Sequence, residues 1–256
     1  MPSALVLKSP ALLEKVIKII NKKLTKPQAE LVSIFSRHFY NSVSEADLID
    51  RNAEALYASI LSLWNFSQGS ISADKGKLRV SNPSIEEHGW QSKHTVIELM
   101  HVDLPFIVDS IRMELNRMGL NTHLMIHVSY HFTRNKNGRI TALEVLHEDR
   151  EVSTETPMYI EVDRQTNPAE LALLQANLER VLRDVSVTVR DWSAMRKRLA
   201  LVIDEVSQSN FPKRKAALNE ALDFLKWIGD DHFTFMGYRY YDAVSVRGDV
   251  LLTPEP

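Results

Sequence analysis

The turn at residues 101–106 holds the side chains best suited to bind a small charged ligand. A short apolar strand leads into the turn, and an amphipathic helix follows it. Free backbone N–H groups at the start of a helix, together with the helix dipole, favour an anion such as a carboxylate. The carboxylate of Asp103 suits the ammonium group of such a ligand. The candidate ligand-binding residues are therefore His101, Asp103, Leu104, Pro105, Phe106 and Asp109.

A second interpretation of the same turn needs no ligand. Asp103 would be the N-cap of the helix, and Pro105 would occupy the first turn, where proline costs no hydrogen bond. Phe106 would then pack into the core. The sequence leaves both interpretations open.

Three histidines at every fourth position, His123, His127 and His131, raise the question of a metal site. They fall in a segment that alternates like a strand, where residues four apart are separated by about 13 Å. The three imidazoles therefore cannot share one ion, and we predict no metal site. A polar sheet face, or a contact with another module, explains the pattern better.

The glycine and cysteine census restricts the chemistry further. The eight glycines never have the G-x-G-x-x-G spacing of a dinucleotide-binding turn. Gly76-Lys77 lacks the first glycine and the hydroxyl residue of a phosphate-binding loop. The chain has no cysteine, which excludes thiolate catalysis and cysteine-ligated zinc. We predict no cofactor and no catalytic residue in this chain.

The charge balance and hydropathy point to an ordinary water-exposed surface. The net charge is −2, so no overall attraction to nucleic acid or to an anionic membrane is expected. No apolar run reaches the length of a membrane span, and the N-terminus lacks the apolar region of a secretion signal. We expect a cytoplasmic protein whose partners are neither nucleic acid nor membrane.

Hydrophobic periodicity predicts an α+β chain. Three helices, beginning near Pro10, Pro27 and Ser44, fill the first seventy residues and can pack as a bundle. A helix capped at Asp103 ends at Gly119, and Asn137-Gly138 predicts a hairpin turn. Strands are expected at residues 77–80, 94–101, 122–133, 139–147 and 158–162.

The pattern is ambiguous after residue 168. Residues 185–189 alternate like a strand that would close a βαββαβ sheet, but helical spacing continues on both sides of them and favours one long or kinked helix. A last helix is expected near residues 213–228. A strand at 232–241 and a hairpin turning at 247–249 would follow.

Four segments resemble one protein family. They are ALYASILSLWNFSQ, IEEHGWQSKHTVIELMHVDLPFIVDSIRMELNRMGLNTHLMIH, VLRDVSVTVRDWSAM and FLKWIGDDHFTFMGYRYYD. Together they look like the N-terminal region of the large NAD-specific glutamate dehydrogenases of bacteria, which carries ACT-like modules. In ACT modules the turn from the first strand to the first helix helps to bind a small amino acid, often between modules. The family's usual glycine after the proline is Phe106 here.

The resemblance implies a domain plan. It consists of a helical N-terminal domain at residues 1–70, an ACT-like domain at 77–190, and a helical linker with the start of a truncated module at 191–256. The ACT-like part would be a βαββα sandwich, an antiparallel sheet with helices on one face. The chain would lack the catalytic domain, so NAD would bind only elsewhere in the parent enzyme.

The resemblance also implies a function. The chain would regulate and oligomerise an enzyme that converts L-glutamate, NAD and water to 2-oxoglutarate, ammonia and NADH. Its partners would be other modules and subunits of that enzyme, with a possible amino-acid effector. Two alternatives remain open: a purely structural assembly domain without a ligand, and a stand-alone amino-acid sensor.

Overall fold

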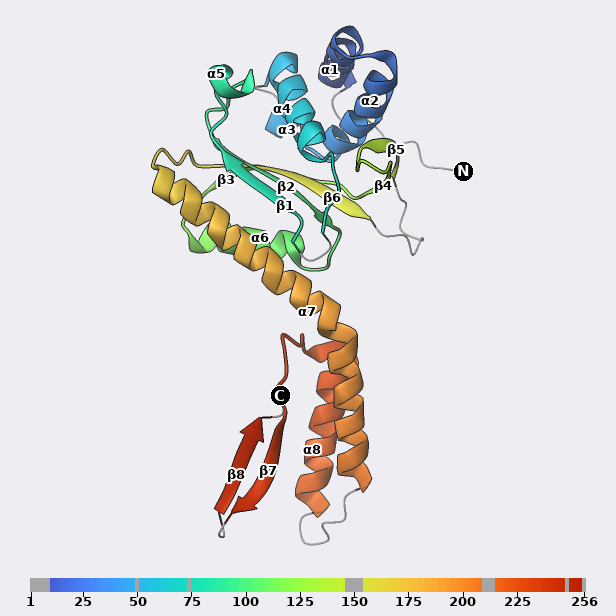
Figure 1. The fold of residues 1–256 in the computed structure, drawn as a ribbon, viewed down its shortest axis with the longest axis vertical. Helices are drawn as coiled ribbons and strands as arrows, with labels where there is room; N and C mark the ends of the chain where they lie inside the picture. The colour runs from blue at the N-terminus through green and yellow to red at the C-terminus, as the bar shows by residue number, and fades with distance from the viewer. Residues whose placement is uncertain are drawn as a thin grey trace. The chain divides into compact units, whose positions relative to one another are not determined.

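The computed structural model describes residues 10–48, 51–72, 75–145, 154–208, 215–246 and 249–254 (Figure 1). The described part forms two compact units, which meet between Val185 and Ser186. The first unit is α+β, as the sequence predicts. None of the described helices is long and apolar enough to cross a membrane.

The first unit begins with helices α1 (Pro10–Lys23), α2 (Lys26–Asn41), α3 (Glu45–Leu48) and α4 (Ala53–Phe66). The single third helix expected from Ser44 onward is wrong, because the chain leaves helical conformation between α3 and α4. Asn52 explains the restart: its side chain accepts a hydrogen bond of 2.8 Å from the backbone N–H of Ala55 and caps α4.

Six antiparallel strands form the sheet: β1 (Lys77–Ser81), β2 (Thr95–Val102), β3 (Thr122–His127), β4 (Tyr130–Arg134), β5 (Ile140–Val145) and β6 (Glu155–Val162). The expected single strand at 122–133 is interrupted between β3 and β4, and both pieces pair with β6. The hairpin predicted at Asn137-Gly138 joins β4 to β5 and is confirmed. The predicted strand end at His147 lies outside the described residues.

The strand order explains how the sheet is completed. β6 lies between β2 on one side and β3 with β4 on the other. The outer position beside β2 is filled by β1, which precedes the helix–strand repeat in the sequence. Residues 185–189 belong to the long helix α7 (Pro168–Gln208), so the preference for helix over a closing strand is confirmed.

Helix α6 (Ile107–Arg117) connects β2 to β3 and corrects one prediction. It begins four residues after Asp103, with Phe106 at the N-cap position and no side-chain cap. Pro105 therefore lies outside the helix. The predicted end is confirmed: Gly119 has φ 72°, and the N–H groups of Gly119 and Leu120 bond to the carbonyls of Asn116 and Leu115.

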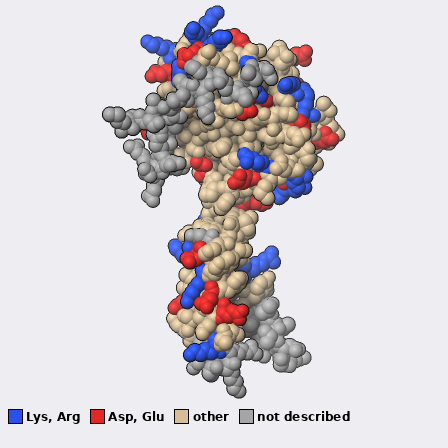
Figure 2. All heavy atoms as spheres, turned by 180° about the vertical axis from the view of Figure 1, so that it is seen from behind, with Lys and Arg blue, Asp and Glu red and all other residues tan. Residues whose placement is uncertain are grey.

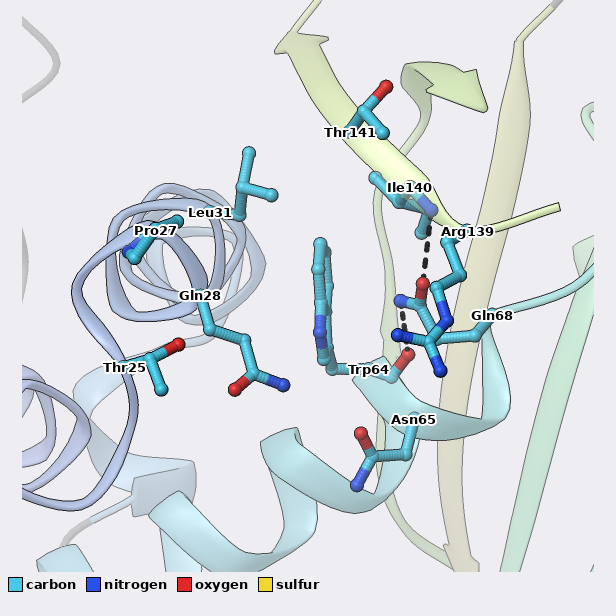
Figure 3. A pocket seen from close by; sticks show the side chains of 10 residues that line it. All are labelled: Thr25, Pro27, Gln28, Leu31, Trp64, Asn65, Gln68, Arg139, Ile140 and Thr141. Carbon is cyan, nitrogen blue, oxygen red and sulfur yellow. Dashed lines mark hydrogen bonds between the residues drawn. The ribbon is translucent and has the colours of Figure 1, made fainter. Parts of the chain in front are cut away.

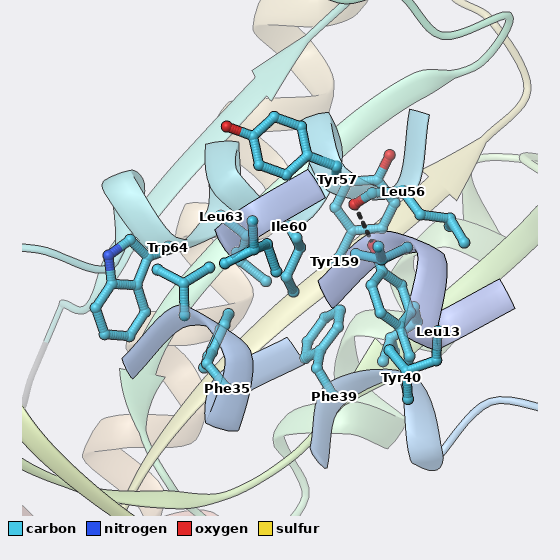
Figure 4. Packing of buried hydrophobic residues seen from close by; sticks show 14 of the residues in the cluster. Leu13, Phe35, Phe39, Tyr40, Leu56, Tyr57, Ile60, Leu63, Trp64 and Tyr159 are labelled. Carbon is cyan, nitrogen blue, oxygen red and sulfur yellow. Dashed lines mark hydrogen bonds between the residues drawn. The ribbon is translucent and has the colours of Figure 1, made fainter. Parts of the chain in front are cut away.

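Both faces of the sheet are covered, although helices were predicted on one face. In Figure 1, α6 and the first part of α7 lie below the sheet, and α1, α2 and α4 lie above it. The upper helices share one apolar core with the sheet, because Phe35 and Leu63 belong to the same buried cluster as Tyr159 of β6 (Figure 4). The N-terminal helices are therefore part of the sheet's own packing.

The second unit contains the last part of α7, helix α8 (Lys215–Trp227), a π-helical turn η2 (Ile228–His232), and the hairpin of β7 (Tyr241–Val246) with β8 (Asp249–Pro254). The expected strand at 232–241 is wrong, because residues 233–240 have no regular structure and the strand begins at Tyr241. The terminal hairpin is confirmed by the β7–β8 pairing. Its turn residues Arg247 and Gly248, and the predicted helix start at Lys213, lie outside the described residues.

Candidate functional site

The predicted effector turn lies between β2 and α6. The side chain of Asp103 accepts hydrogen bonds from the hydroxyls of Ser129, at 2.6 Å, and Thr154, at 3.4 Å. Its backbone N–H donates to the Thr154 carbonyl at 2.8 Å. The carboxylate is thus held by Ser129, which lies between β3 and β4, and by Thr154, which precedes β6. It does not cap α6.

Phe106 has an uncommon backbone conformation. Its φ of 69° makes it the one non-glycine residue with positive φ among those described. This left-handed conformation costs roughly 1 kcal/mol for a residue with a Cβ. The side chain is 52% exposed, so it does not pack into the core as the ligand-free interpretation required. Strain of this kind is enriched at binding sites and turns.

The remaining predicted residues divide into two groups. His101 is fully buried, its Nδ1 lies 2.8 Å from the Val102 carbonyl, and its ring packs where a Cβ on Gly76 would stand. It therefore supports the turn from inside. Pro105 and Asp109 are exposed and Leu104 is half-buried, so these residues stay beside Asp103 and Phe106 on the surface.

A second, charged site was missed by sequence reasoning. A cavity of about 380 Å³ opens between the α3–α4 connection, the loop at 90–94 and strands β3 and β6. On its wall, Arg51 makes two hydrogen bonds to Glu161, of 2.8 and 2.6 Å, and the Tyr159 hydroxyl donates to the same carboxylate at 2.8 Å. Glu161 is 2% exposed. Burial alone would raise the pKa of Glu161, but the Arg51 and Tyr159 bonds outweigh it and lower the pKa.

Two of the cavity's lining residues are stacked histidines. The rings of His94 and His123 lie 4.1 Å apart, and His123 contacts Asp163 at 2.7 Å. Partial burial lowers the pKa of His94, and the nearby His123 adds to that effect. His127, the second member of the predicted stripe, is exposed. The described residues include no group of three or more potential ligands arranged for a metal.

No local sequence signal marks this cavity. Arg51 and Glu161 are 110 positions apart and come from a helix connection and a strand. In sequence, Glu161 is an ordinary polar position at the end of an apolar strand. Glu161 is buried because it lies on the sheet face that the N-terminal helices cover, and a buried carboxylate requires a charged partner.

Comparison with known proteins identifies the family. A family model described as the glutamate dehydrogenase ACT1 domain matches residues 35–178. The NAD-specific glutamate dehydrogenase of Halomonas elongata is 38% identical over 239 residues, which cover 93% of this chain and 15% of that protein. The protein of the same name from Pseudomonas aeruginosa is 35% identical over 217 residues, covering 84% and 13% respectively.

The matched segment runs from α2 into α7 and so contains the whole sheet together with the predicted turn. The chain spans about one seventh of the length of these relatives. The quoted motifs and the family match agree, and the chain belongs to the NAD-specific glutamate dehydrogenase family, in which it corresponds to the N-terminal region that contains the ACT1 domain.

Proposed function

We propose that this chain is a regulatory and oligomerising region of a cytoplasmic NAD-dependent glutamate dehydrogenase and has no catalytic activity of its own. The parent enzyme would oxidise L-glutamate to 2-oxoglutarate and ammonia, with NAD bound in another part of it. The carrying observation is the ACT1 family match over residues 35–178, which includes every strand of the sheet. The missing G-x-G-x-x-G spacing supports the placement of NAD elsewhere.

We further infer that residues 77–190 form an ACT-like domain. Two features support this. First, β2, α6, β3, β6 and α7 occur in the order of a split βαβ arrangement, with the β4–β5 hairpin inserted between β3 and β6. Second, α6 and the first part of α7 cover the same face of the sheet (Figure 1). β1 takes the outer position that a closing strand after α7 would otherwise fill.

The turn between β2 and α6 is the proposed effector site. The ammonium group of an amino acid would bind the Asp103 carboxylate, which Ser129 and Thr154 hold in place. Its carboxylate would face the start of α6, where backbone N–H groups lack a side-chain cap. The exposed Phe106 ring would cover the ligand. Such a ligand regulates a distant catalytic domain only if it binds two states of the enzyme with different affinities.

A thermal-shift panel of the standard amino acids tests the effector site. A ligand present at about one hundred times its dissociation constant adds about 2.7 kcal/mol to the stability of the folded state. We expect one amino acid to raise the melting temperature of the wild type and of the control Glu86→Gln. Asp103→Asn, which keeps the shape of the side chain, should remove the shift. If every amino acid leaves the wild type unchanged, the structural assembly role replaces the effector role.

Sedimentation equilibrium tests the oligomerising role separately. We expect the purified 256-residue chain to form a concentration-dependent oligomer. A monomer at all accessible concentrations would contradict assembly through this region, whatever the result with amino acids.

A further inference from the structure

A cavity on the upper side of the first unit is separate from both sites described above. It has a volume of about 620 Å³, within the size range of small-molecule sites. It lies between the start of α2, the end of α4 and the start of β5 (Figure 3). Its apolar lining comes from Pro27, Leu31, Trp64 and Ile140.

The walls of this cavity are held in place by hydrogen bonds to backbone groups. Gln68 donates to the Trp64 carbonyl and accepts from the Ile140 N–H, both at 3.0 Å, which ties the end of α4 to β5. The N–H of Gly69 donates to the Gly138 carbonyl at 2.9 Å. The cavity is therefore formed before any ligand binds, which lowers the cost of binding.

Several hydrogen-bond donors on the lining have no protein partner within the described residues. They are the hydroxyl of Thr25, the side-chain amides of Gln28 and Asn65, the indole N–H of Trp64 and the guanidinium of Arg139. Trp64 is only 3% exposed, but its N–H is not among the described side-chain atoms that are buried without a partner, so it remains accessible at the cavity surface. In Figure 3 its nitrogen lies at the end of the ring nearer the Gln28 and Asn65 amides.

The charge of the lining selects the ligand. Arg139 is the only ionisable side chain among the lining residues, and no carboxylate opposes it. The Arg139 guanidinium and the Trp64 indole N–H can only donate and therefore favour an anion, because charge-assisted hydrogen bonds are stronger than neutral ones. The Trp64 ring with Leu31 and Ile140 favours a carbon skeleton over a bare inorganic ion. We propose that this cavity binds a small organic carboxylate with a flat or compact apolar body.

This site does not depend on the proposed function. It shares no residue with the turn at 101–109, and its ligand need not contain an ammonium group. Asp103→Asn should leave benzoate binding intact, and Arg139→Gln should leave unchanged any amino-acid shift that depends on Asp103.

The test uses benzoate as the probe and the whole chain as the protein. Calorimetry gives the affinity, and the indole N–H resonance of Trp64, assigned with Trp64→Phe, reports the location. We expect benzoate to shift this resonance. Arg139→Gln, at an exposed position, should weaken benzoate binding about tenfold or more through loss of a charge-assisted contact.

Two further ligands and one matched variant complete the experiment. Benzamide has the same shape without the charge, and inorganic phosphate has charge without the ring; both should bind about tenfold more weakly than benzoate or not at all. Lys136→Gln removes a charge from the same hairpin outside the cavity lining and should leave binding unchanged. The proposal fails if benzoate does not move the Trp64 resonance, if benzamide or phosphate binds equally well, or if Arg139→Gln and Lys136→Gln have the same effect.

Discussion

The most consequential single residues are two buried glutamates on neighbouring strands, Glu161 on β6 and Glu98 on β2. Each is nearly inaccessible and faces an arginine: Arg51 binds Glu161 through both carboxylate oxygens, while Arg79 binds only one oxygen of Glu98. The other Glu98 oxygen has no partner among the residues that the structure describes. Replacing each glutamate by glutamine should therefore change the pH dependence of stability in opposite directions at the two positions.

Arg51→Met should destabilise the protein by about 3 kcal/mol, because it leaves a buried carboxylate without its cation. The Arg51 side chain is 24% exposed and that of Glu161 is 3% exposed, so solvent replaces the lost contact only in small part. The measurement is urea unfolding. Arg37→Met, which breaks the solvent-exposed pair with Glu14 at 2.6 Å, is the control and should change little. Equal losses in the two variants would show that burial does not determine the effect.

The pH dependence distinguishes the two glutamates. Burial raises the pKa of Glu98 despite Arg79, whereas the bonds from Arg51 lower the pKa of Glu161. Glu161 therefore contributes stability above about pH 4, the ordinary range of glutamate, and loses it as pH falls through its folded pKa. Glu98 contributes most below that range and loses its contribution as pH rises through its folded pKa.

Unfolding free energies of Glu98→Gln and Glu161→Gln, measured from about pH 3 to pH 7, test this opposition. As pH rises, the unfolding free energy of Glu98→Gln should increase relative to that of the wild type. The unfolding free energy of Glu161→Gln should decrease relative to that of the wild type. Parallel pH profiles would show that the two carboxylates have the same environment.

At the scale of elements, two glycines show how the hairpin and the helices are joined. Gly138 in the β4–β5 turn has φ 74°, and a Cβ there would lie 2.5–2.8 Å from the backbone of Gly69 and Ser70, in the segment that follows α4. Gly119 after α6 has φ 72° and open space around it. Gly138 is required both by its positive φ and by the nearby backbone of Gly69 and Ser70. Gly119 is required by its positive φ alone.

Gly119→Ala should cost roughly 1 kcal/mol, the penalty of a left-handed conformation for alanine. Gly138→Ala should cost clearly more in urea unfolding, because backbone atoms cannot move aside as a flexible side chain can. It should also weaken benzoate binding, since the displaced hairpin carries Arg139 and Ile140. A similar small loss in both variants would mean that the hairpin tolerates separation from α4.

At the scale of the whole molecule, the two compact units differ in how much they bury. The described core lies almost entirely in the first unit, where the first part of α7 contributes Leu174, Leu178 and Leu182, while Phe224 and Trp227 of the second unit are exposed. Acidic and basic side chains are interspersed on the face shown in Figure 2, in keeping with the net charge of −2. The surface in this view favours neither sign of partner.

A chain shortened to residues 1–190 should keep the urea midpoint of the first unit, because it retains that part of α7.

The reverse deletion, of residues 1–70, should leave an insoluble protein, because it uncovers the sheet face on which Phe35, Leu63 and Trp64 pack. Circular dichroism and solubility measure both outcomes. A soluble, folded 71–256 chain would show that the helices form a domain independent of the sheet. The proposed boundaries at 70 and 190 depend on these results.

The sequence by itself determined the family, the α+β class, the long helix through residues 185–189, the helix end at Gly119 and the hairpin at Gly138. Each of these depends on local periodicity, on a turn residue with one strong preference, or on a continuous motif. The helix start after Asp103 was predicted incorrectly, because the Asp103 carboxylate bonds to Ser129 and Thr154, which are distant in sequence.

Only the tertiary structure decided that β1 completes the sheet, that the N-terminal helices cover one of its faces, and that Arg51 meets Glu161. The cavity lined by Trp64 and Arg139 likewise combines residues from α2, α4 and β5 that share no sequence pattern. Contacts of this kind depend on how whole elements pack together. The packing energy is distributed over many apolar side chains, which can often replace one another, so no single residue marks the contact in the sequence.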